Sequence, residues 1–157
     1  MKRSILFFLP LMLHCASIYT KTEINASPEM VWGQLMAFEK YPEWNPFLRI
    51  EGNPEKDKVL QVKFHRGGDD WFSLSPKVLK NSDKHLIWRG RLFVPGIFTG
   101  EHEFRVEQIS VNRVIFYHDE KFNGLLVPFF GFGDTEKKFA AMNQALKKRS
   151  ENAAGKP

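Results

Sequence analysis

Cysteine is almost absent from this chain, because its 157 residues include only Cys15. A single cysteine cannot form an intramolecular disulfide. The sequence also has no glycine-rich phosphate loop, serine nucleophile elbow, metalloprotease helix or paired-cysteine zinc motif. No short motif therefore points to nucleotide binding, serine-dependent hydrolysis or a structural zinc site.

A basic face is also missing, although the formal net charge is +5. The excess lies at the two ends of the chain, in Lys2, Arg3, Lys147, Lys148, Arg149 and Lys156. Without these residues and Glu151, 17 basic and 17 acidic residues remain. Nucleic-acid-binding domains concentrate Lys and Arg on one face with interleaved aromatics. We therefore expect no nucleic-acid partner.

Long hydrophobic runs are missing as well, since the apolar stretch from Ile5 to Leu13 is shorter than the roughly 20 residues of a membrane span. Lys2 and Arg3 precede this stretch and the small residues Ala16 and Ser17 follow it. This order is typical of a secretory signal peptide. Residues 1–17 are thus interpreted as a signal peptide or apolar leader, and cleavage after Ser17 would export the protein.

Two alternatives to export stay open. The chain could begin at Met12 and be cytoplasmic, or the uncleaved leader could anchor it to a membrane. Cleavage after Ser17 would also remove the only cysteine, leaving the mature form without thiol chemistry. In each case residues 18–151 form one domain and residues 152–157 a disordered tail.

Hydrophobic residues make up 43% of the chain and include 15 Phe, enough for one aromatic core. Alternating apolar and polar residues between turn signals predict about seven strands. The predicted strands span residues 18–25, 47–51, 59–65, 71–80, 85–92, 98–109 and 114–122. Pro76 suggests an edge or a bulge within the fourth of them.

Helix signals lie near both ends of the domain. Ser27 can cap a short helix that starts at Pro28, and its buried stripe is Val31, Leu35 and Phe38. A longer amphipathic helix is predicted from Asp134, which can cap it, to about Arg149. Its buried stripe consists of Phe139, Met142 and Leu146.

The last two long strands allow a prediction of register. A three-residue connection at residues 110–112 pairs His102 with Glu120, Phe104 with His118 and Val106 with Phe116. A shift by one residue would turn every side chain to the opposite face and bring Asp119 and Lys121 onto the apolar side. We therefore predict the first register, because it keeps Asp119 and Lys121 off the mostly apolar face.

Three segments together resemble the SRPBCC superfamily, which shares the START-like helix-grip fold. They are Tyr41-Pro42-Glu43-Trp44-Asn45-Pro46-Phe47, Trp88-Arg89-Gly90 and Gly100-Glu101-His102-Glu103-Phe104. The resemblance implies an α+β fold in which a curved antiparallel sheet wraps around a long C-terminal helix and encloses an apolar cavity. It also implies that Phe129, Phe130 and Phe132 border the cavity mouth.

Ten residues are expected to line this cavity. They are Trp88, Phe98, His102, Phe104, Phe116, His118, Glu120, Phe122, Phe139 and Met142. The polar members His102, His118 and Glu120 need partners if they are buried. They could form a cross-strand charge pair, orient the polar end of a ligand, act as a general acid–base pair or bind zinc.

Non-catalytic binding or transport of a small hydrophobic molecule is our leading hypothesis, with a lipid, isoprenoid, quinone or polyketide-like compound as the ligand. No cofactor or metal is expected, the protein is expected to be a monomer, and membrane contact could occur through the leader or during ligand exchange. The alternatives are a cyclase or dehydratase that uses the same cavity and a protein-interaction module of the chaperone-activator type. Fold resemblance alone does not decide among them.

Overall fold

The computed structural model describes residues 14–92, 94–129 and 131–155. Five strands form an antiparallel sheet in the order β1-β8-β7-β6-β5. Their bounds are His14–Ile24 for β1, Lys77–Ser82 for β5, His85–Leu92 for β6, Phe98–Ser110 for β7 and Arg113–Gly124 for β8. A second antiparallel sheet has the order β2-β3-β4. Its strands are Leu48–Glu51, Gln61–Gly67 and Asp70–Leu74.

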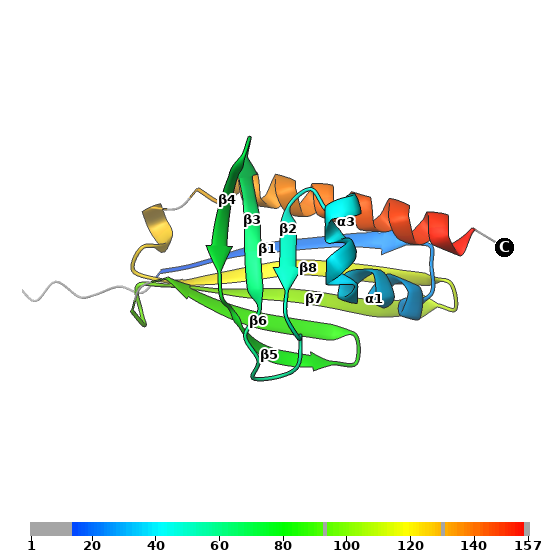
Figure 1. The fold of residues 1–157 in the computed structure, drawn as a ribbon, viewed down its shortest axis with the longest axis horizontal. Helices are drawn as coiled ribbons and strands as arrows, with labels where there is room; N and C mark the ends of the chain where they lie inside the picture. The colour runs from blue at the N-terminus through cyan, green and yellow to red at the C-terminus, as the bar shows by residue number, and fades with distance from the viewer. Residues whose placement is uncertain (1–13, 93, 130, 156–157) are drawn as a thin grey trace, which may run out of the picture.

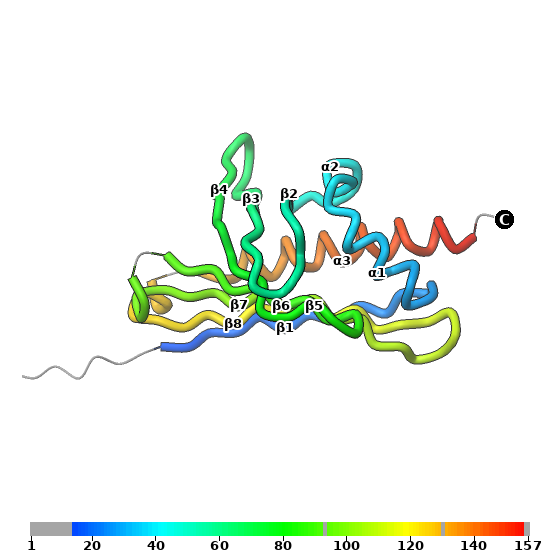
Figure 2. Tube along the Cα trace, turned by 60° about the horizontal axis from the view of Figure 1, so that its bottom comes forward, coloured from blue at the N-terminus to red at the C-terminus, as the bar shows by residue number. Residues whose placement is uncertain are grey.

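The described ranges contain five helical segments. These are α1 (Pro28–Met36), η1 (Phe38–Lys40), α2 (Tyr41–Trp44), η2 (Val127–Phe129) and α3 (Gly133–Ala154). The helix α3 runs along the larger sheet, and the strands of the smaller sheet stand across it (Figures 1 and 2). This is the helix-grip fold that the sequence predicted. No helix in the described ranges is long and apolar enough to cross a membrane.

The predicted fourth strand is divided at Pro76, so the described ranges contain eight strands instead of the predicted seven or so. The part before Pro76 is β4 in the smaller sheet, and the part after it is β5 in the larger one. Proline has no N–H group to donate to a strand ladder. Its carbonyl oxygen instead accepts a 2.9 Å hydrogen bond from Leu60 N, which ties the two sheets together at this point.

The register of β7 and β8 is the predicted one. His102 pairs with Glu120, Phe104 with His118 and Val106 with Phe116. The connection itself differs, because Ser110 pairs with Arg113 and the turn contains two residues instead of three. A bulge between Gln108 and Ser110 absorbs the extra residue and keeps the remaining pairs in place.

The first helix and the turn that follows it also match the sequence prediction. Ser27 Oγ accepts a hydrogen bond from Met30 N, and Val31, Leu35 and Phe38 are buried. Asn45 is buried, and its Oδ1 accepts hydrogen bonds of 2.9 Å from the backbone N–H groups of Phe47 and Leu48. This side chain therefore fixes the turn that leads into β2.

The predicted start of the first strand and both predicted ends of the last helix differ from the structure. Strand β1 begins at His14 rather than Ile18, because β8 extends to Gly124 and offers it further backbone partners. Helix α3 begins at Gly133 without a side-chain cap, so Asp134 lies in its first turn. The helix also continues to Ala154 and thus enters the tail that we expected to be disordered. Glu151 stabilises this last part, because its carboxylate accepts hydrogen bonds from Asn25 and forms an ion pair with Lys147.

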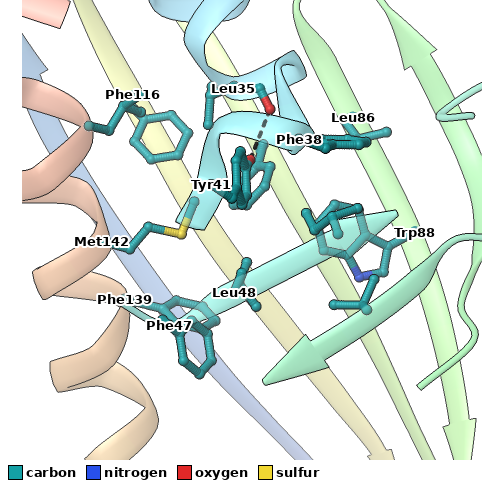
Figure 3. Packing of buried hydrophobic residues seen from close by; sticks show 14 of the residues in the cluster. Leu35, Phe38, Tyr41, Phe47, Leu48, Leu86, Trp88, Phe116, Phe139 and Met142 are labelled. Atoms are coloured by element: carbon teal, nitrogen blue, oxygen red, sulfur yellow. Dashed lines mark hydrogen bonds between the residues drawn. The ribbon is translucent and has the colours of Figure 1, made fainter. Parts of the chain in front are cut away.

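The core lies between the larger sheet and the helices, as the close-up in Figure 3 shows. Phe139 and Met142 enter it from α3, and the ring of Phe139 lies 5.6 Å from that of Phe47. Tyr41 is fully buried, and its hydroxyl donates a 2.9 Å hydrogen bond to Leu35 O. Burial raises the pKa of the Tyr41 phenol above its usual range, so the hydroxyl stays neutral.

The buried Asn45 turn predicts a measurable contribution to stability. Asn45→Ala leaves two buried N–H groups without an acceptor, so the free energy of unfolding should fall by about 2 kcal/mol. Asn53→Ala is the matched control, since Asn53 Oδ1 accepts a hydrogen bond from Glu55 N at an exposed turn. It should change the unfolding free energy by less than about 0.5 kcal/mol in urea titrations. Equal effects of the two substitutions would contradict the role given to Asn45.

Candidate functional site

A cavity of about 300 Å³ lies at one end of the larger sheet. The smaller sheet contributes residues of β3 and β4, the larger sheet contributes the ends of β6, β7 and β8, and the start of α3 covers the remaining side. Most of the lining is apolar, and aromatic rings dominate it. The cavity therefore lies where the two sheets and α3 diverge, and not along the whole concave face.

Four of the ten predicted lining residues reach the cavity, namely Trp88, Phe98, Glu120 and Phe122. The other six are buried in the packed core and do not line it. They are His102, Phe104, Phe116, His118, Phe139 and Met142. Ligand contact by the first four stays a prediction.

Ring stacking explains why the middle of the concave face holds no cavity. The ring of Phe139 stacks on His118 with centroids 3.7 Å apart and an interplanar angle of 13°. Trp88 stacks on His102 at 4.5 Å, and Phe104 packs edge-on against both histidines. The helix therefore packs directly on the centre of the sheet, and the cavity lies toward the N-terminal end of α3.

The smaller sheet supplies lining residues that the sequence analysis missed. Phe64 of β3, Phe72 and Leu74 of β4 and Phe47 before β2 all face the cavity. The alternation of apolar and polar residues in these strands predicted that one face is buried. It did not indicate that this buried face borders the cavity. Phe132 lines the cavity as predicted, Phe129 is 81% exposed, and Phe130 lies outside the described residues.

Two glycines open the floor of the cavity. Gly90 of β6 and Gly100 of β7 are paired across the strands, and both line the cavity. A Cβ atom at Gly100 would lie 2.8 Å from Glu120 Oε1. The carboxyl group of Glu120 therefore occupies the space that a side chain at position 100 would take.

Glu120 contacts His102 behind the cavity floor. His102 Nδ1 lies 3.2 Å from Glu120 Oε2, and the two side chains are only 1% and 12% exposed. Burial raises the pKa of Glu120 to about 8 and lowers the pKa of His102 to about 3. The predicted contact is therefore present, and burial favours the uncharged form of both partners over a charge pair.

His118 belongs to a separate network that ties α3 to the sheet. Its Nδ1 lies 2.8 Å from Asn143 Oδ1, and Asn143 Nδ2 donates a 2.9 Å hydrogen bond to Thr20 Oγ1. Thr20 Oγ1 in turn donates a 2.6 Å hydrogen bond to His118 O. Burial holds the pKa of His118 well below its usual range. We therefore assign His118 a structural role, because its Nδ1 contacts Asn143 of α3 and its side chain does not line the cavity.

A zinc site is not supported by this arrangement. Among the described residues, no three His, Cys, Asp or Glu side chains come together in a way that could hold a metal ion. His118 Nδ1 contacts Asn143, whereas the carboxyl group of Glu120 contacts His102. The two histidines and Glu120 are neighbours on one face but do not converge on one point.

Most charged residues of β7 and β8 lie on the face opposite the cavity, as predicted from the register, whereas Arg66, Arg91 and Lys138 of other elements line the cavity. Glu101 pairs with Lys121 across β7 and β8, and Glu101 also accepts two hydrogen bonds from Arg89. His85 Nε2 lies 2.9 Å from Glu103 Oε1 on this face. These groups are far from an apolar lining and are ordinary surface pairs.

The family model described as polyketide cyclase/dehydrase and lipid transport matches residues 16–152. No curated protein sequence matches the chain.

Solved structures with a similar fold include two enzymes and one START protein. Norcoclaurine synthase from Thalictrum flavum, solved with dopamine and hydroxybenzaldehyde, has a TM-score of 0.65 at 15% identity, with 99% of this chain and 100% of that chain covered. The Zhui aromatase/cyclase from Streptomyces sp. R1128 has a TM-score of 0.58 at 15% identity over 89% and 88% of the two chains. A START superfamily protein from Mycobacterium smegmatis has a TM-score of 0.61 at 18% identity over 88% and 96%. At these identities the likeness shows the fold alone.

The raised pKa of Glu120 predicts a specific pH dependence of stability. Between the ordinary carboxyl pKa of 4.5 and the folded value of about 8, the folded protein binds more protons than the unfolded chain. The free energy of unfolding contributed by Glu120 therefore falls as the pH rises through this window. Glu120→Gln removes this pH-dependent contribution. The free energy of unfolding of the variant, measured relative to that of the parent, should therefore increase by on the order of 3 kcal/mol from pH 5 to pH 8.5.

The histidines act in the opposite direction but cancel in this comparison. Because the pKa values of His102 and His118 are lowered, their contribution rises with pH up to about 6.5 in both proteins. Urea denaturation across the pH range measures the difference directly. A constant difference between Glu120→Gln and the parent would show that Glu120 is ionised in the folded state.

Proposed function

Because the chain belongs to the polyketide cyclase/dehydrase and lipid transport family, we propose that its cavity binds and carries a small hydrophobic molecule with one polar group. The observation that carries the proposal is the apolar cavity of about 300 Å³ with the Glu120 carboxyl group on its floor. A protein whose interior is filled would have no such space. The cavity therefore supports ligand binding over an interaction module with a closed core.

The size of the cavity restricts the ligand. Pockets for small molecules typically measure about 300–1,000 Å³, so this one lies at the lower limit. It suits a molecule of one or two rings or a short isoprenoid chain better than a diacyl lipid. The aromatic lining from Trp88, Phe98, Phe122 and Phe132 offers ring faces and edges to such a ligand. Burial of apolar surface would supply about 25 cal/mol per Å² before ordering costs.

Glu120 supports selection of the ligand's polar group. Its Oε2 contacts His102, whereas Oε1 has no hydrogen-bond partner among the described residues. A neutral carboxyl group can donate to a carbonyl oxygen or accept from a hydroxyl group without bringing a charge into the cavity. Glu120 therefore suits a ligand carbonyl or hydroxyl group at the cavity floor.

A cyclase or dehydratase activity is the second candidate, and the same carboxyl group favours it. A pKa of about 8 would let Glu120 donate or accept a proton near neutral pH, as general acid–base catalysis requires. The neutral His102 would act as a positioning residue that holds the carboxyl group against the floor. An enzyme of this kind would convert the bound molecule chemically, whereas a carrier would release it unchanged.

Native mass spectrometry of the gently purified protein, followed by organic extraction, tests both candidates. A stoichiometric apolar compound would identify the ligand class. Returning that compound to the stripped protein separates the candidates. Unchanged compound after incubation indicates a carrier, whereas a product that Glu120→Gln no longer forms indicates an enzyme. A protein without any bound compound would count against both.

Blocking the cavity should abolish uptake of an apolar probe. Thr135 lines the cavity from the first turn of α3, and Ala140 is exposed on the same helix outside the lining. We expect the fluorescent probe N-phenyl-1-naphthylamine to bind the parent and Ala140→Trp equally and to bind Thr135→Trp at least about tenfold more weakly. Fluorescence titration gives the three affinities. Equal binding by Thr135→Trp would mean that the probe binds elsewhere.

We also propose that residues 1–17 act as a signal peptide for export. Residues 1–13 of the leader lie outside the described residues, whereas His14 to Ser17 belong to β1 and pair with β8. Cleavage after Ser17 would thus shorten β1 by four residues. N-terminal sequencing of the protein from its host determines whether this cleavage occurs.

A further inference from the structure

The charged residues that line the cavity are mostly cationic. Arg66 of β3, Arg91 of β6 and Lys138 of α3 belong to the lining, and Glu120 is the only acidic residue among its described members. Burial raises the pKa of Glu120 to about 8, so its carboxyl group stays uncharged at neutral pH. We name Arg66, Arg91 and Lys138 the cationic rim. No acidic group in the described lining balances their charge.

The cationic rim lies on the open side of the cavity, and Glu120 lies on the closed side. The floor is buried, since the side chain of Glu120 is 12% exposed and Trp88 is 2% exposed. The side chain of Arg66 is 62% exposed, Arg91 is exposed and Lys138 is half-buried. A bound molecule that extends from the floor to the opening therefore meets an uncharged carboxyl group at one end and positive charge at the other.

Lys138 joins the cavity lining from α3. Thr135 and Lys138 are about one helical turn apart and both line the cavity, so they share the face of α3 that borders it. Lys138 Nζ donates a 3.1 Å hydrogen bond to Arg66 O in the β3–β4 hairpin, which lies beside the first turns of α3 (Figure 1). An ammonium group has three N–H donors, so two of them remain for a ligand.

Lys138 also has no negatively charged partner in the part of the chain that the structure describes. Arg66 differs, because its Nε lies 3.5 Å from Asp70 Oδ2. Lys137, next to Lys138, lies outside the lining and forms an exposed ion pair with Asp134 at 3.6 Å. An ammonium group beside apolar side chains attracts an anion more strongly than one in water, because the effective dielectric constant is lower. A ligand anion would therefore supply the partner that the described chain does not.

We propose that the ligand is an aromatic or short isoprenoid carboxylic acid whose carboxylate binds Lys138. This inference rests on the proposed function, and it adds an acid group at the end opposite to the polar group that meets Glu120. The Thr135 hydroxyl group has no hydrogen-bond partner among the described residues, and it can donate to the same carboxylate from one turn before Lys138. Charge-assisted hydrogen bonds of this kind offset the hydration that a carboxylate loses when it enters an apolar cavity.

Competition between a matched acid and amide tests the inference in the full chain. 1-Naphthaleneacetate and 1-naphthaleneacetamide have nearly the same shape and differ by one charge, and each competes with N-phenyl-1-naphthylamine for the cavity at neutral pH. We expect the parent to bind the acid at least about fivefold more tightly than the amide. Lys138→Gln keeps a donor for Arg66 O but removes the charge, so acid binding should weaken by at least about fivefold while amide binding stays unchanged. Lys138→Arg and the control Lys137→Gln should keep the preference of the parent.

The results separate this inference from the proposed function. If N-phenyl-1-naphthylamine does not bind the parent, the carrier function itself is wrong. If this neutral probe binds but the parent does not prefer the acid over the amide, or if Lys138→Gln keeps that preference, the carboxylate site at Lys138 is refuted. An equal loss of preference in Lys137→Gln would mean that general surface charge attracts the acid, and it would refute the site as well.

Discussion

The antiparallel register of β7 and β8 is the constraint on which the site depends. It sets His102 opposite Glu120 and Gly100 opposite Phe122, so that the inner face carries one carboxyl group beside the space left by a glycine. A one-residue slip would turn Asp119 and Lys121 inward and carry Glu120 to the outer face. The bulge between Gln108 and Ser110 accommodates the one-residue difference introduced by the two-residue turn, so the pairs farther along β7 and β8 keep the same register.

Packing then decides which part of the concave face becomes a cavity. Phe139 stacks on His118 and Asn143 hydrogen-bonds to it, so α3 contacts the sheet closely along its middle. Toward the N-terminal end of α3, residues of the smaller sheet, of β6 and β7 and of α3 border the cavity together, and the absence of a side chain at Gly100 makes room for the Glu120 carboxyl group on its floor. The same burial that keeps His102 and Glu120 neutral makes this floor suitable for an uncharged polar group.

The sequence allowed the fold, the register and the partner of Glu120 to be predicted, because alternation and residue pairing are local properties of neighbouring strands. It did not allow the cavity to be placed. The separation of β4 from β5 depends on which strands Leu60 and Pro76 contact, and that is a long-range property. Asn143 could have been found, since it continues the buried stripe of Phe139, Met142 and Leu146 at helical spacing. The neutral state of Glu120 depends on the depth of burial, which no pattern of residues specifies.

Infrared spectroscopy of the carboxyl group tests the central claim most directly. If Glu120 is a neutral acid on the cavity floor, a protonated C=O stretch that is absent from Glu120→Gln should persist at pH 7 and shift when N-phenyl-1-naphthylamine enters the cavity. A spectrum in which Glu120 is already ionised at pH 7, or a band that does not respond to the probe, would contradict the account.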